Sequence, residues 1–169
     1  PAAALDGVAE DLAASLAAAY QASSPAWPWF EPGLAPNSAR LPRALLGTPF
    51  QAAGLDSLAW LCRLCEREDG IMSFALTAED GRTVEYPASA AAVVSACLEA
   101  CRASGDESFR RWAQRASEWF TGRNAAGISM VDPETGGCYD ALRPDGVEPN
   151  QGAGALLAWL TAAEDLAES

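Results

Sequence analysis

The sequence of 169 residues contains no histidine. Imidazole is the usual acid–base group of serine and cysteine hydrolases, and it is the commonest side chain that binds metals in proteins. Its absence excludes Ser-His-Asp and Cys-His catalysis and any zinc site that uses histidine. Chemistry in this chain would therefore depend on carboxylates, tyrosines, thiols or arginines.

Positive charge is also scarce, with 11 basic and 23 acidic residues and a net charge of −12. A protein that binds nucleic acid needs a basic surface that displaces counterions from phosphates, so we expect no nucleic-acid partner. The same charge disfavours anionic membrane surfaces. The sequence has no signal peptide and no apolar run of about 18 residues, so we expect no membrane span and a cytoplasmic location.

The five cysteines lie in apolar surroundings. Cys62 and Cys65 are one helical turn apart, and so are Cys97 and Cys101. Two cysteines of one helix are poorly placed for a disulfide, and these spacings lack the turn geometry of zinc knuckles. We therefore predict buried, reduced thiols, with no metal and no cofactor.

Alanine is abundant and β-branched residues are few, which favours helix over sheet. The length suits a single domain that spans residues 1–169. The segment 70–87 alternates enough for one small β-hairpin, with Glu79-Asp80-Gly81 as its turn. The apolar periodicity predicts about six helices, at 3–21, 38–47, 49–68, 88–103, 105–122 and 150–167.

The helix at 88–103 is almost entirely small or apolar, so we expect it at the centre of the molecule. Its short link to 105–122 predicts an antiparallel helical hairpin. Small-residue helices that alternate with aromatic ones are typical of the two layers of an α/α toroid. We expect buried stripes at Leu5, Val8, Leu12, Leu16 and Ala19 of the first helix, and at Leu156, Leu157, Leu160 and Leu166 of the last.

Aromatic residues crowd a short stretch that two prolines keep out of regular helix. Trp27, Trp29 and Phe30 precede a carboxylate, Glu31. Such a stiff loop could form a platform on which sugars stack. Alternatively, the aromatic rings could fill the core between helix ends.

The segment 136–159 combines turn residues, polar side chains and the start of an apolar helix. Asp140 could act as a base, accept a hydrogen bond from a ligand, or cap a turn. Asn150 could be the N-cap of the last helix or contact a ligand together with Gln151. Tyr139 could donate a hydrogen bond.

Six short motifs of this chain occur in the same order in a known family. They resemble the α/α-toroid, six-hairpin-glycosidase-like domain that follows the transferase domain in certain bacterial glycosyltransferases. The resemblance covers about residues 25–165 and implies the second half of such a domain, an α/α-hairpin half-toroid. The motifs are WPWFE at 27–31, ARLPRALLG at 39–47, VVSACLEACRASGD at 93–106, WF-x-G-x-N at 119–124, GGCYDAL at 136–142 and NQGA at 150–153.

Several polar positions of the family's motifs differ here. Pro36, Asn37 and Ser38 stand where Tyr-Asp-Asn is usual. Tyr86–Ser89 replaces Asp-Gln-Gln-Pro, and Gly154 and Ala155 replace Glu-Ser. The residues that match are Glu31, Arg40, Asp140, Asn150 and Gln151.

Glycoside hydrolysis with inversion needs two opposed carboxylates about 6.5–9.5 Å apart. Only Glu31 and Asp140 stand out as candidates, so ordinary glycosidase activity is not expected. The resemblance implies a repurposed acid/base enzyme, a cyclase, an isomerase or a glycosidase-like protein, directed at a small molecule or a sugar. Its acid would be Glu31 and its base Asp140, with ligand contacts from Trp27, Trp29, Arg40, Tyr139, Asn150 and Gln151.

Two alternatives remain open. The chain could be a non-catalytic carbohydrate-binding or accessory module in which Trp27 and Trp29 stack on sugar rings. It could also be an interaction domain, because a half-toroid leaves its inner helices uncovered and we would then expect a homodimer.

Overall fold

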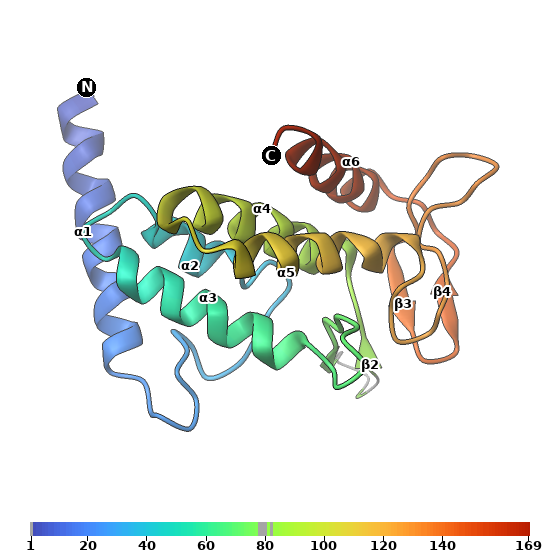
Figure 1. Cartoon of the computed structure of the whole chain (residues 1–169), viewed down its shortest axis with the longest axis horizontal. Coiled ribbons are helices and arrows are strands. Elements are labelled where there is room, and N and C mark those ends of the chain that lie inside the picture. The colour runs from blue at the N-terminus through green and yellow to red at the C-terminus, as the bar shows by residue number, and fades with distance from the viewer. Residues whose placement is uncertain (1, 78–80, 82) are drawn as a thin grey trace.

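The computed structural model describes residues 2–77, 81 and 83–169, with side chains from residue 7 onward. This part of the chain is mostly helical and carries two small antiparallel hairpins (Figure 1). The helices are α1 (Ala2–Gln21), α2 (Arg40–Leu45), α3 (Gln51–Cys65), α4 (Pro87–Ser104), α5 (Glu107–Glu118) with the 3-10 turn η1 (Trp119–Thr121), and α6 (Ala153–Ala167). The strands are β1 (Leu76–Thr77), β2 (Thr83–Val84), β3 (Ala141–Arg143) and β4 (Gly146–Glu148).

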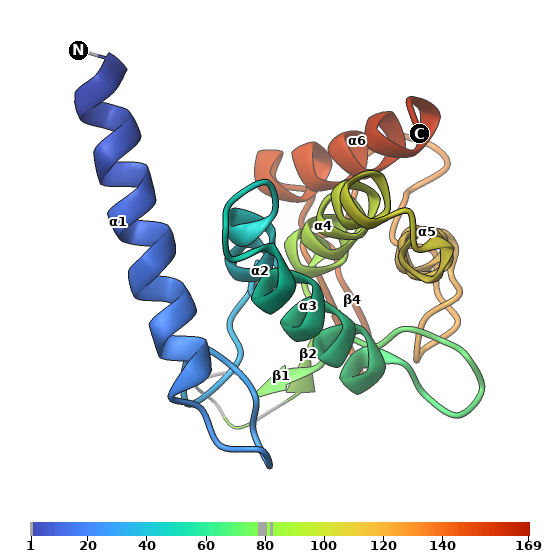
Figure 2. The same cartoon turned by 60° about the vertical axis from the view of Figure 1, so that its left-hand side comes forward.

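Helix α4 is the centre of the fold, as its sequence predicts. It packs against α5 and α6, and also contacts α2 and α3 (Figure 2). Ala90, Ala96 and Ala100 are completely buried, because small side chains let several neighbours approach one helix. A hydrogen bond from Ser95 to Asp165 links α4 to α6.

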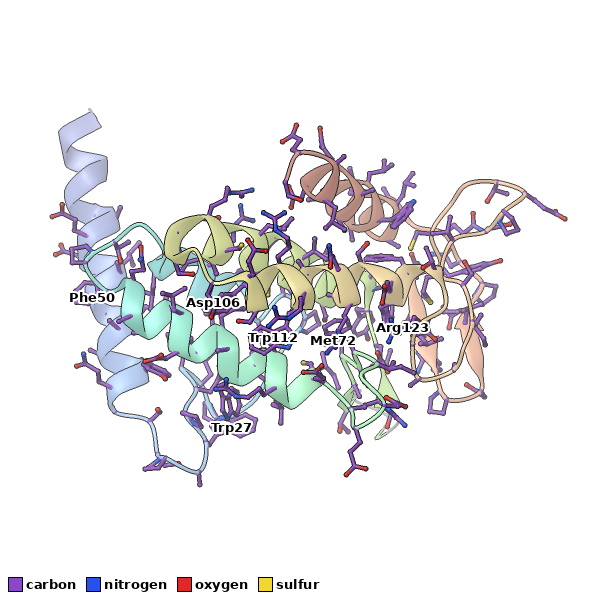
Figure 3. All side chains as sticks on the ribbon, viewed as in Figure 1. Trp27, Phe50, Met72, Asp106, Trp112 and Arg123 are labelled. Carbon is purple, nitrogen blue, oxygen red and sulfur yellow. The ribbon has the colours of Figure 1, made fainter. Side chains whose placement is uncertain are left out.

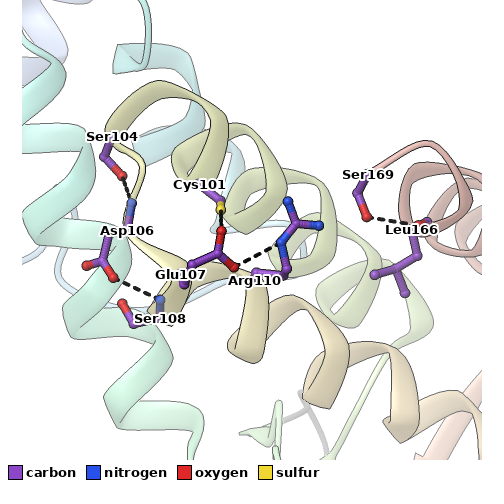
Figure 4. A network of polar contacts seen from close by, with 8 residues as sticks. All are labelled: Cys101, Ser104, Asp106, Glu107, Ser108, Arg110, Leu166 and Ser169. Carbon is purple, nitrogen blue, oxygen red and sulfur yellow. Dashed lines mark hydrogen bonds and ion pairs between the residues drawn. The ribbon is translucent and has the colours of Figure 1, made fainter.

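The short turn between α4 and α5 is held by local polar contacts (Figure 4). Gly105 ends α4 with a φ of 74°, a conformation that glycine adopts without strain. Asp106 then caps α5, since its Oδ1 accepts a hydrogen bond from the Ser108 N–H at 2.8 Å. This hydrogen bond lowers the pKa of Asp106. The two helices run antiparallel, which confirms the predicted helical hairpin.

The hairpin predicted within 70–87 is present, with Leu76 opposite Val84. Glu79 and Asp80 of its predicted turn lie outside the described residues. A second hairpin pairs β3 with β4 in a segment that the sequence analysis treats as an irregular loop. The backbone of Glu85 bonds to that of Leu142 in both directions, at 2.8 and 2.9 Å, and so joins the two hairpins.

The predicted buried stripe of α1 is wrong for most of its residues. Val8 and Leu12 are 54% and 65% exposed, whereas Ala13 and Ala17 are buried. Ala19 is exposed too, and Leu16 alone of the described stripe residues packs against the core. Leu5 lies among the residues whose side chains are not described. The first half of α1 extends past the other described helices (Figures 1 and 2), which leaves Val8 and Leu12 uncovered.

The predicted stripe of α6 is wrong in its first half. Leu157 and Leu160 are 63% and 52% exposed, while Ala155 and Ala162 face the core. Trp159 packs on the ring of Phe120 with centroids 5.2 Å apart, and Leu166 of the predicted stripe does pack against the core. The buried face of α6 therefore combines alanines with Trp159 and Leu166.

Helix α2 begins at Arg40 with Ala39 as its N-cap residue, so the predicted start at residue 38 is two residues too early. The Ser38 hydroxyl bonds to the backbone of Ala35. Helices α2 and α3 lie close together at Gly54, which has no side chain to separate them. A Cβ at this position would lie 2.8 Å from the carbonyl oxygen of Pro42.

Candidate functional site

The aromatic loop packs largely into the core. Trp29 is only 2% exposed, and its ring lies 5.1 Å from that of Phe30 and 5.5 Å from that of Trp60. Trp27 is half-buried below α3 (Figure 3), with its Nε1 donating to the carbonyl oxygen of Glu31 at 2.8 Å. Trp29 is therefore a core residue, and its predicted role in ligand stacking is wrong.

Glu31 and Arg40 are both exposed. They share no ion pair in the described part of the chain. The next arginine, Arg43, binds Glu99 Oε2 on α4 at 2.7 Å. Glu31 thus lacks the apolar surroundings that an acid catalyst would use.

Asp140 accepts hydrogen bonds from the residues that lead into α6. Its Oδ1 accepts the N–H of Gly152 at 2.7 Å, and its Oδ2 accepts the side-chain amide of Asn150. The backbone N–H of Asp140 also donates to the Asn150 carbonyl at 2.9 Å. Gly152, not Asn150, is the N-cap residue of α6, which corrects the predicted cap. Asp140 and Asn150 do lie together, but their polar atoms bond to each other and to the backbone.

Gln151 belongs to a neighbouring cluster built around Asp132, which the sequence analysis missed. Its Nε2 donates to Asp132 Oδ2 and its Oε1 accepts from Thr135, both at 2.8 Å. The pKa of Asp132 is lowered, first by the backbone N–H of Glu134 and then by Gln151. The sequence VDPETGG marks this turn, because aspartate before proline commonly begins one. Tyr139 is half-buried and packs against the core.

Replacing Asp140 with alanine should lower the free energy of unfolding by about 1–2 kcal/mol, because the Gly152 N–H and the Asn150 amide lose their acceptor. Urea unfolding measures the change. Asp145→Ala, in the exposed turn between β3 and β4, is the control and should change stability by less than about 0.5 kcal/mol. Equal effects of the two substitutions would contradict this structural role.

The cysteines are free and buried, as predicted. Cys62 on α3 faces Cys97 on α4, with the sulfur atoms 3.4 Å apart. Burial raises the pKa of Cys62 and Cys65, and burial with the charge of Asp140 raises the pKa of Cys138 to about 11. These three thiols are therefore protonated at neutral pH and are poor nucleophiles.

A cavity of about 600 Å³ opens beside Trp27. Its walls come from the loop at 27–39, the end of α3, the segment 73–77 and the first turns of α4. Most of the lining is apolar, including Leu61, Phe74 and Val93. Of the predicted site residues, Trp27 alone lines it within the described part of the chain.

Three serines, Thr77 and Arg67 give this cavity its polar character. The hydroxyl of Ser38 is bonded to Ala35, and that of Ser73 donates to Glu85 Oε1 at 2.9 Å. The hydroxyl of Ser89 is buried and has no hydrogen-bond partner among the described residues. A buried hydroxyl without a partner is costly, so a ligand that reached it would offset that cost.

Glu85 is a buried carboxylate that the sequence analysis did not single out, with only 4% of its surface exposed. Besides the Ser73 hydroxyl, it accepts the Phe74 N–H and the Trp119 Nε1–H, each at 2.8 Å. It lines a second cavity of about 300 Å³ together with Arg67 and Arg143. No local pattern around Glu85 distinguishes it from an exposed strand residue.

Within the described residues, no group of three or more cysteine, aspartate or glutamate side chains is placed to hold a metal ion. In the same part of the chain, no helix has the length and apolar character needed to cross a membrane.

Comparisons of the chain with protein-family models and with curated proteins find no match. The resemblance to a glycosyltransferase-associated toroid therefore stays a prediction, and the function is argued from the cavities alone.

Proposed function

We propose that the chain binds a small molecule with an apolar body and a hydrogen-bonding group in the cavity beside Trp27. The volume of about 600 Å³ lies within the range of ligand sites, about 300–1,000 Å³. The observation that carries the proposal is the buried Ser89 hydroxyl, which lacks a partner in the wall of this cavity. A ligand that bonds to this hydroxyl would remove its desolvation cost.

The position of the carboxylates supports binding rather than acid–base catalysis. Among the described residues that line the cavity there is no aspartate or glutamate. Glu31 is exposed, and the carboxylate of Asp140 is occupied at the start of α6. A reaction with Glu31 as acid and Asp140 as base therefore has less support than a binding function.

We also propose that the helices form a half-toroid. Helix α4 contacts both α2 and α6, as neighbouring inner helices of a toroid would. Helix α3 packs on α2 and α5 packs on α4, as their outer partners would. The adjacency of the helices supports this arrangement, and the cavity would lie at the starts of the inner helices.

Ser89→Ala should change stability and binding in opposite directions. Without ligand, the free energy of unfolding should rise by about 1 kcal/mol, because a buried hydroxyl without a partner is removed. Affinity for octanol, a neutral apolar probe with one hydroxyl, should fall about fivefold, because a neutral hydrogen bond contributes about 1 kcal/mol. Urea unfolding and isothermal titration calorimetry measure the two effects.

Ser117→Ala, on the half-buried side of α5, controls for the helix propensity gained with alanine. It should leave octanol affinity unchanged. Ala35→Trp, at the exposed rim of the cavity, should block octanol with little effect on the fold. If wild-type protein does not bind octanol, the proposal is wrong. Binding of glucose in its place, with loss in Trp27→Ala, would favour the carbohydrate-binding alternative.

A further inference from the structure

The two cavities are neighbours, because Arg67, Ser73 and Ala75 line both the cavity of about 600 Å³ and the cavity of about 300 Å³. A ligand that spans both would hold its apolar body in the first and pass these side chains to reach the second. The second cavity differs in character, since it gathers Arg67 and Arg143 around Glu85.

The ion pairs of these two arginines are longer than others in this protein. Arg67 Nε lies 3.5 Å from Asp69 and Arg143 Nε lies 3.7 Å from Glu148. For comparison, Arg123 contacts the Glu118 carboxylate at 2.8 Å.

Moreover, Nη1 of Arg143 is buried and has no hydrogen-bond partner in the part of the chain that the structure describes. A guanidinium N–H withdrawn from water without an acceptor is costly, and a carboxylate or phosphate is its natural partner. The described protein groups therefore leave one donor of Arg143, a residue that lines the second cavity, unused.

The charge of the second cavity indicates how many negative charges a ligand would bring. Among its described lining residues, two guanidinium groups and one carboxylate give a net charge of +1. The Glu85 carboxylate already accepts from Ser73, Phe74 and Trp119, so its oxygens are directed to these donors. Asp69 and Glu148 already lie near these two arginines, so a ligand with a single negative charge fits the cavity better than a phosphate dianion beside Glu85.

We propose that the ligand of the larger cavity is an apolar carboxylic acid whose carboxylate binds to Arg67 and Arg143 in the smaller cavity. This inference rests on the proposed binding function and specifies its ligand class. The planar guanidinium of arginine forms paired hydrogen bonds with a carboxylate. The body of the ligand then lies against Trp27 and the leucines of the larger cavity.

Octanoate and octanol, which share an apolar chain and differ in charge, test this inference by titration calorimetry. Octanoate should bind at least about tenfold more tightly, because a charge-assisted hydrogen bond contributes more than a neutral one. Arg143→Gln should weaken octanoate about tenfold or more and change octanol less than about twofold. Arg143→Lys should recover part of the loss.

Arg110→Gln is the matched control, because it removes the same charge from a surface pair with Glu107 at 3.1 Å. It should leave octanoate affinity within about twofold of wild type. If Arg143→Gln fails to fold, the salt dependence of the wild-type protein decides, since octanoate binding should weaken with salt and octanol binding should not.

Equal affinities for octanoate and octanol would overturn the carboxylate inference and leave the binding function intact. Absence of binding by both probes would instead overturn the binding function. Tighter binding of octyl phosphate than of octanoate would replace the carboxylate with a phosphate ester.

Discussion

Replacing Glu85 with alanine is expected to lower the free energy of unfolding by about 4 kcal/mol. Three donors lose their acceptor at once, the Ser73 hydroxyl, the Phe74 N–H and the Trp119 indole N–H. Trp119 and Phe74 are buried, so their N–H groups have little access to replacement water. Urea unfolding followed by tryptophan fluorescence measures the loss.

Glu85→Gln should lower the free energy of unfolding by less, about 2 kcal/mol. The glutamine side chain keeps one acceptor oxygen, but its NH2 group then faces one of the three hydrogen-bond donors. Glu118→Ala is the control, since Glu118 pairs with Arg123 at the surface with 43% of its side chain exposed. That change should cost less than about 1 kcal/mol. If Glu85→Ala lowers the free energy of unfolding by less than about 1 kcal/mol, the carboxylate does not stabilise the fold as proposed.

Trp119→Ala should lower the free energy of unfolding by about 3–5 kcal/mol, the range for aromatic residues removed from a core. Trp119 is completely buried. Its ring packs edge-on against Phe120, with centroids 5.3 Å apart, and against Phe74 at 6.1 Å. Differential scanning calorimetry or urea unfolding measures the effect.

Trp119→Phe separates packing from hydrogen bonding, because it keeps an aromatic ring and removes the donor to Glu85. It should cost about 1–3 kcal/mol. Trp112→Ala is the matched control on α5, since this tryptophan is only partly buried and bonds to Glu66 at 3.1 Å. If Trp112→Ala destabilises the protein as much as Trp119→Ala, the central role of Trp119 is wrong.

The sequence predicted the central helix and the first hairpin because both depend on local composition. A segment of almost entirely small and apolar residues can only be buried, and α4 is. It predicted the buried faces of α1 and α6 wrongly, because leucine spacing defines an apolar face without saying whether another element covers it. Where helices approach closely, Ala17 and Ala162 fit and leucines do not.

The candidate site was only partly predictable, because most of its contacts join segments that are far apart in the sequence. Asp140 and Asn150 were expected together and do contact each other, since both belong to one loop. The cavity beside Trp27 takes its walls from four separate segments, which no single motif reveals. Glu85 and Arg143 come together through the pairing of Glu85 with Leu142, a long-range contact that the sequence does not encode locally.

The sparse contacts of α1 imply that the protein does not open as one unit. This helix buries Ala13 and Ala17 against Leu45 and leaves Val8 and Leu12 in solvent. Its separation from the other helices therefore requires only a fraction of the free energy of global unfolding, whereas α4 becomes accessible only when the whole core opens. None of the described residues that line either cavity belongs to α1. A ligand would consequently protect the core from opening and leave the fraying of α1 unchanged.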